Sequence, residues 1–75
     1  MFALIQEDDV QVTQHAAEKM LVEGLTIKQI CRALERGSKF RQTEGHLTVY
    51  GYFSVAYKMV SGKYRIKTVF INKER

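Results

Sequence analysis

Residues 13–37 read TQHAAEKMLVEGLTIKQICRALERG and predict two short helices with a signal at each end. The first should run from Thr13 to Gly24, because a threonine hydroxyl accepts from the free amides of a first turn and glycine readily ends a helix. The second should run from Thr26 to Gly37. It opens with a capping box, in which a glutamine three residues after Thr26 bonds back to the threonine amide.

After Gly37 the hydrophobic period changes from helical to alternating, which is typical of strands. We expect turns at 44–45 and 61–62, a kink or bulge at Gly51, and strands at 38–43, 46–50, 52–60 and 63–72. Residues Phe2–Ile5 are a candidate for a short first strand. The predicted fold class is therefore α+β, with two N-terminal helices packed on one face of a three- to four-stranded antiparallel sheet.

A chain of 75 residues has room for one hydrophobic core, so we expect residues 1–75 to form a single domain that a partner or a homodimer would stabilise further. Cys31 is the only cysteine, and no Cys/His spacing typical of zinc occurs, so neither a metal nor another cofactor is predicted. The first nine residues lack the basic start of a signal peptide and the length of a membrane span. We therefore predict a cytoplasmic protein without membrane contact.

Positive charge is concentrated in the strand-rich half. Residues 46–75 carry six cations against one anion, a net charge of +5, and four tyrosines lie at 50–64. Cations bind phosphates and aromatic rings stack on bases, so RNA is the predicted partner. An equally weighted alternative is a solvated outer sheet face, where lysines prevent strands of different molecules from pairing. The predicted nucleic-acid-binding residues are Arg41, Lys58, Arg65, Lys67 and Tyr57.

Several short motifs resemble those of one family of small prokaryotic domains. They are His15-Ala16, Lys19, Gly24-Leu25-Thr26, Ile30, Leu34, Gly37, Gly51-Tyr52 and Ile66-Lys67-Thr68-Val69. The family is an uncharacterised one that is grouped with the RelE-like toxins, within the barnase, EndoU, colicin and RelE ribonuclease fold. The resemblance extends from about Thr13 to Ile71, although members usually carry arginine where this chain has Lys19. It implies a RelE-like endoribonuclease, the toxin of a toxin–antitoxin pair with a cognate antitoxin as partner, whose catalytic residues are His15, Lys19 and Thr68.

Metal-independent RNA cleavage requires a base for the 2′-hydroxyl and cations beside the phosphate. His15 suits the base, because the helix dipole and Lys19 one turn away both favour a neutral imidazole. Thr68 is suited to donate a hydrogen bond to a phosphate oxygen. For these residues to meet, the Ile66-Thr68-Phe70 face of the last strand must point toward the helices. The general acid is unassigned, with Tyr57 and His46 as weak candidates.

These residues also have structural explanations. A histidine in a first turn can simply cap or pack, His46 follows a turn and is expected to be exposed, and Cys31 is expected to be buried packing. The second hypothesis is therefore a non-catalytic module of the same fold that binds RNA or a protein. Growth arrest that disappears in His15→Ala would separate the two hypotheses.

Overall fold

The computed structural model describes residues 5–72, and both predicted helices form where their caps place them. α1 (Gln14–Glu23) follows Thr13, whose Oγ1 accepts a hydrogen bond from the Ala16 amide at 3.1 Å. It ends at Gly24, which is left-handed with a φ of 74°. α2 (Ile27–Arg36) begins with the predicted capping box at Thr26 and is followed by Gly37. Local capping therefore sets the ends of both helices, as predicted.

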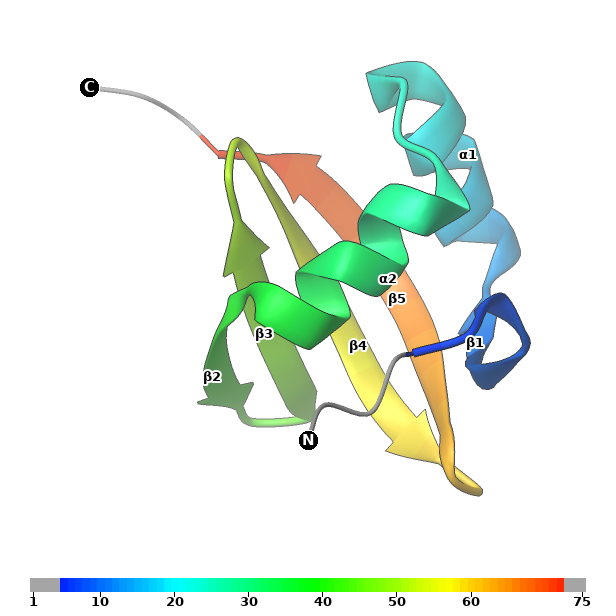
Figure 1. Ribbon diagram of the computed structural model, residues 1–75, viewed down its shortest axis with the longest axis vertical. Helices are drawn as coiled ribbons and strands as arrows, with labels where there is room; N and C mark the ends of the chain where they lie inside the picture. The colour runs from blue at the N-terminus through cyan, green and yellow to red at the C-terminus, as the bar shows by residue number, and fades with distance from the viewer. Residues whose placement is uncertain (1–4, 73–75) are drawn as a thin grey trace.

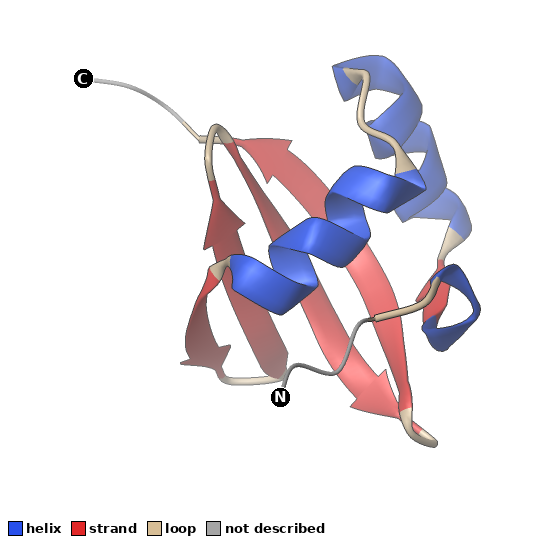
Figure 2. Cartoon of the chain, viewed as in Figure 1, coloured by secondary structure: helices blue, strands red, loops and turns tan. Residues whose placement is uncertain are grey.

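The strands form one mixed sheet of five strands in the order β1-β5-β4-β3-β2. They are β1 (Val10–Val12), β2 (Ser38–Gln42), β3 (Gly45–Tyr50), β4 (Phe53–Val60) and β5 (Lys63–Ile71), and a short 3-10 helix, η1 (Glu7–Asp9), precedes β1. β2 to β5 are antiparallel neighbours, whereas β1 is parallel to β5. Figure 1 shows α2 crossing in front of the sheet with α1 beside β5, and Figure 2 shows the two layers by element type. The α+β class with two helices on a sheet is confirmed.

The sheet differs from the prediction at its first strand. The predicted antiparallel strands are present as β2 to β5. The short first strand that the sequence also suggested is β1, which lies at Val10–Val12 and is parallel to β5, so the sheet is mixed and has five strands. The candidate strand Phe2–Ile5 lies outside the described residues apart from Ile5, which is not in a strand. β1 has only three residues and pairs with a strand far along the chain. The sequence around it is therefore too short to show the alternation that predicts a strand.

Two-residue turns connect the antiparallel strands. Gly51, expected to be a kink or bulge between two strands, instead lies with Tyr52 in a turn between β3 and β4, where Tyr50 pairs with Phe53. The predicted turn between β4 and β5 is present, with Ser61 and Gly62 both at positive φ (51° and 78°). Positive φ at both central residues gives a hairpin turn the right-handed twist of its strands.

A β-bulge in β5 decides which side chains meet the helices. Ala56 pairs with Thr68 and Tyr57 with Ile66, so Lys67 is the extra residue. Alternation restarts after the bulge, and Ile66 and Val69 both point to the helices with 0% exposure. The predicted helix-facing set was right for Ile66 and wrong for Thr68 and Phe70, because the extra residue in the bulge reverses the side to which the residues after Lys67 point.

The core lies between the helices and one side of the sheet. α1 contributes Ala16 and Met20, and α2 contributes mainly Ile30 and Leu34, all packed with the strands in one cluster. α2 also approaches β3 closely, because the buried Thr48 hydroxyl donates to the Ala33 carbonyl at 2.8 Å. We call this side of the sheet the helix side. Its other side, the open face, is covered by no helix among residues 5–72 and carries Phe40, Leu47, Val49, Ser54, Ala56, Lys58, Arg65, Lys67, Thr68 and Phe70.

Candidate nucleic-acid interface

His15 lies in the first turn of α1 and is exposed to solvent. The turn is held against β5 by Thr13, whose hydroxyl donates to the carbonyl of Ile66 at 3.1 Å and contacts that of Lys67 at 3.4 Å. The backbone amide of Thr13 also donates to the Ile66 carbonyl at 3.3 Å. The start of α1 is therefore held beside β5 at the bulge.

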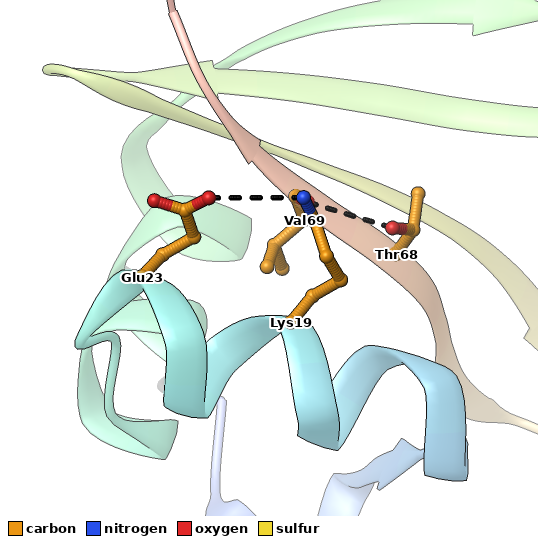
Figure 3. Close-up of polar contacts among 4 residues, drawn as sticks. All are labelled: Lys19, Glu23, Thr68 and Val69. Carbon is orange, nitrogen blue, oxygen red and sulfur yellow. Dashed lines mark hydrogen bonds and ion pairs between the residues drawn. The ribbon is translucent and has the colours of Figure 1, made fainter.

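Lys19 and Thr68 do not share this arrangement. Lys19 is one turn after His15 and forms an ion pair with Glu23, with 3.7 Å between Nζ and Oε2. Figure 3 shows Val69 pointing from β5 toward α1, whereas Thr68 lies on the other side of the strand. The Thr68 hydroxyl approaches only the Val69 carbonyl, at 3.5 Å. The structure therefore keeps His15 and Lys19 on one helix and turns Thr68 away from them.

Three of the five predicted RNA-binding residues line one hollow of about 370 Å³ on the open face, which we call the basic hollow. Lys58 of β4 and Arg65 of β5 are direct cross-strand partners, and Lys67 comes from the bulge. Like charges directly opposite each other destabilise a sheet. Their convergence therefore creates a local positive potential that a bound anion would relieve. The full lining is Glu44, Lys58, Val60, Arg65 and Lys67.

Little negative charge is available to neutralise the basic hollow. Glu44 is its only acid, and the Lys67 ammonium binds the Glu44 main-chain carbonyl at 2.8 Å rather than its carboxylate. Within residues 5–72 the one ion pair joins Lys19 to Glu23, so no carboxylate pairs with Lys58, Arg65 or Lys67. The hollow therefore gathers three cations whose charge is complementary to that of a phosphate or another anion.

Aromatic side chains stand on the open face beside the basic hollow. Phe40 of β2 is 54% exposed and Phe70 of β5 is 39% exposed. Between them the face is formed by half-buried Leu47 and Val49 of β3 and by the small, buried Ser54 and Ala56 of β4. Exposed rings on an open sheet are surfaces on which unpaired bases stack.

Neither phenylalanine was among the residues predicted from sequence. Phe40 lies between two cations, Lys39 and Arg41, on a strand with no acidic residue. An aromatic residue flanked by basic residues on a predicted strand is the sequence pattern that could have identified Phe40 as a candidate RNA-binding residue. Phe70 carries no such signal, because only the bulge places it on the open face.

The other two predicted RNA-binding residues lie on the helix side. Arg41 is opposite His46, and His46 is opposite Tyr57, whose side chain is only 4% exposed. The rings of His46 and Tyr57 stack with centroids 5.4 Å apart and an interplanar angle of 20°. Burial, and then the neighbouring Tyr64, raise the pKa of the Tyr57 hydroxyl. The structure thus separates Tyr57 and Arg41 from the basic hollow.

His46 also differs from the prediction of an exposed turn residue. It is the second residue of β3, it is half-buried, and its Nδ1 is shielded from solvent without a hydrogen-bond partner in the described part of the chain. The turn closes one residue earlier than predicted, at Thr43 and Glu44, which brings His46 into the sheet.

Within residues 5–72 two kinds of feature are absent. No cluster of three or more His, Cys, Asp or Glu side chains there is arranged to hold a metal ion. No helix in this range is long and apolar enough to cross a membrane. Comparisons with protein-family models, with curated proteins and with solved structures find no match to this chain.

Proposed function

We propose that this chain binds single-stranded RNA across the open face of its sheet. The observation that carries the proposal is the basic hollow, where Lys58, Arg65 and Lys67 converge and no carboxylate of residues 5–72 pairs with them. RNA phosphates supply the negative charge that the basic hollow lacks, and each contact between a cation and a phosphate releases a condensed counterion. A binding site on the open face does not require the helix side to change.

Single strands fit this face better than a duplex does. A duplex hides its bases in a stack, whereas a single strand can lay bases on exposed rings while its backbone follows a basic groove. Phe40 and Phe70 supply the rings. Phe40 lies in the cross-strand row of Ala56, two residues before Lys58 on β4, and Phe70 is paired with Ser54, four residues before Lys58. The open face therefore combines both components of a sequence-tolerant RNA site.

The test measures the affinity of a fluorescently labelled oligouridine of about 12 nucleotides over a range of salt concentrations. The slope of log affinity against log salt falls by about 0.7 for each phosphate contact that is removed from a single strand. We expect the triple variant Lys58→Ala, Arg65→Ala, Lys67→Ala to reduce the slope by about 2. The matched control removes the same charge from the exposed face of α2: Lys28→Ala, Arg32→Ala, Arg36→Ala.

Stacking is tested separately from charge. Replacing Phe40 or Phe70 with alanine should weaken binding by about 1–3 kcal/mol and leave the salt slope unchanged. Equal losses in the open-face and α2 triple variants would show that only net charge matters and would overturn the proposed site.

A second candidate function is RNA cleavage, in which the chain acts as a metal-independent endoribonuclease and as the toxin partner of an antitoxin. The anchoring of the α1 start to Ile66 and Lys67 favours it, because the helical turn that carries exposed His15 begins at Thr13, which contacts the bulge that also carries Lys67. His15 would act as general base, with Lys19 beside the phosphate. Thr68 would have to contribute from the opposite side of β5, and its hydroxyl is the weakest part of this candidate.

Cleavage is separated from binding by one substitution. If the chain is a ribonuclease, His15→Ala abolishes both RNA cleavage and growth arrest on expression, while oligouridine still binds through the basic hollow. RNA that stays intact with the unmodified protein under conditions where it binds would exclude this candidate and leave the binding function in place.

A further inference from the structure

β2 is an exposed edge of the sheet. It is the last strand in the order β1-β5-β4-β3-β2, and all five of its residues are exposed. Alternate residues of an edge strand direct their backbone N–H and C=O groups away from the sheet, where another strand can pair with them. The opposite edge, β1, has only three residues. β2 is therefore the longer edge on which an additional strand can form.

The side chains of β2 define what kind of strand would fit. Lys39 pairs with Thr48 and Arg41 with His46, so both cations lie on the helix side, and Phe40 lies between them on the open face. Lys39 binds the Gly37 carbonyl at 3.2 Å, and neither cation is paired with a carboxylate in the described residues. An added strand would therefore meet alternating positive charges on one side and an exposed ring on the other.

A second copy of this chain fits the edge poorly. An antiparallel pair of β2 strands centred on Phe40 would place Lys39 of each copy opposite Arg41 of the other, and like charges in direct cross-strand positions are destabilising. An acidic strand reverses the sign of both contacts. The two cations of this edge strand thus disfavour pairing with a second copy and favour pairing with an acidic strand.

We propose that the β2 edge binds an extended acidic segment of a partner protein, which adds a sixth strand to the sheet. Main-chain hydrogen bonds supply the general attraction, and Lys39 and Arg41 select acidic side chains at alternate positions. The site does not depend on RNA binding, since its two cations lie on the helix side, away from the basic hollow.

The probe is a short synthetic peptide in which glutamate alternates with valine, added to isotope-labelled protein. We expect the largest amide shifts in β2 and slower hydrogen exchange of its outward amides. The variant Lys39→Glu, Arg41→Glu should weaken binding at least about tenfold, since two cross-strand charge pairs change sign. The matched control, Lys28→Glu with Arg32→Glu on the exposed face of α2, changes the net charge equally and should leave binding intact.

Two control peptides separate strand pairing from simple charge attraction. Methylating alternate backbone nitrogens of the peptide removes its donors on one edge and should abolish binding, and replacing glutamate with lysine should do the same. Binding that survives backbone methylation, shifts that map to the basic hollow, or self-association through β2 at the same concentration would each overturn the proposal. Loss of oligouridine binding alone would leave it standing, because that result concerns the open face.

Discussion

The helix side and the open face of the sheet share strands β3 to β5 but differ in what surrounds their side chains. On the helix side Val55, Ile66 and Val69 have no exposed surface, whereas on the open face Phe70 is 39% exposed. Both helices pack on the first side, and the second carries two exposed rings and the three cations of the basic hollow. Stability is thus concentrated on one side of the strands, so that charges which oppose folding can gather on the other.

The largest expected effect tests this division directly. Ile66→Ala should lower the free energy of unfolding by about 2–5 kcal/mol, because it leaves a cavity between α1 and the sheet. Phe40→Ala, on the open face, should cost less than about 1 kcal/mol, because the ring is already half in solvent. Urea unfolding measures both. Equal losses would mean that the open face also holds the fold together.

A close approach on the helix side gives the next effect. A Cβ at residue 37 would lie 2.2 Å from Thr48 Oγ1 and 2.6 Å from the Ala33 carbonyl. Gly37→Ala should therefore destabilise the protein by about 1–3 kcal/mol, since α2 must move from β3 to make room. The adjacent exposed residue supplies the control, and Ser38→Ala should change stability by no more than about 0.5 kcal/mol.

The tether between α1 and β5 should give a smaller effect. Thr13→Ala removes an N-cap and the hydroxyl contacts to the carbonyls of Ile66 and Lys67, and it should cost about 1–2 kcal/mol. Thr26→Ala removes a cap that makes no contact with the sheet and should cost less. Thr13→Ser keeps the hydroxyl and is expected to retain most of the stability. Thermal unfolding of the three variants would show whether the tether adds anything to capping.

The smallest effect is a pH dependence of the helix side. Burial raises the pKa of Tyr57, with Tyr64 adding to the shift, so the folded protein holds this proton more tightly than the unfolded chain does. The resulting stability is fully present below the ordinary tyrosine pKa of about 10 and is lost as the pH rises above it. In an absorbance titration Tyr57 should ionise at a pH above the ordinary tyrosine pKa. Tyr57→Phe should lose less stability than the unmodified protein between neutral and alkaline pH.

The helices were predictable because their determinants are local. Thr13 and Thr26 cap amides three residues away, and glycines follow both helices, so short stretches of sequence contain the whole signal. The hairpin at Ser61 and Gly62 was predictable for the same reason. The class and the order of the elements from α1 to β5 followed from these local signals and from the change of period after Gly37.

The bulge was not predictable from alternation alone. Apolar residues occupy both faces of β5, so its pattern fits either orientation, and the burial of both Ile66 and Val69 requires one extra residue between them. The spacing of these two core residues can be recognised as a bulge only when the pairing of β5 with β4 is known. As a result Lys58, Arg65 and Lys67 were named individually as RNA-binding candidates, but their meeting in one hollow was not predicted.

The pairing of β1 with β5 has a consequence for the order in which the chain folds. The hydrogen bond from Thr13 to Ile66 spans 53 residues, whereas the hairpins of β2 to β5 close through turns of two residues. Contacts between distant parts of a chain form slowly, because the intervening loop must lose entropy first. During synthesis, therefore, the segment made first must wait for β5 before it can dock. Until then α1 exposes Ala16 and Met20, and that interval is when this protein is most open to aggregation and to proteases.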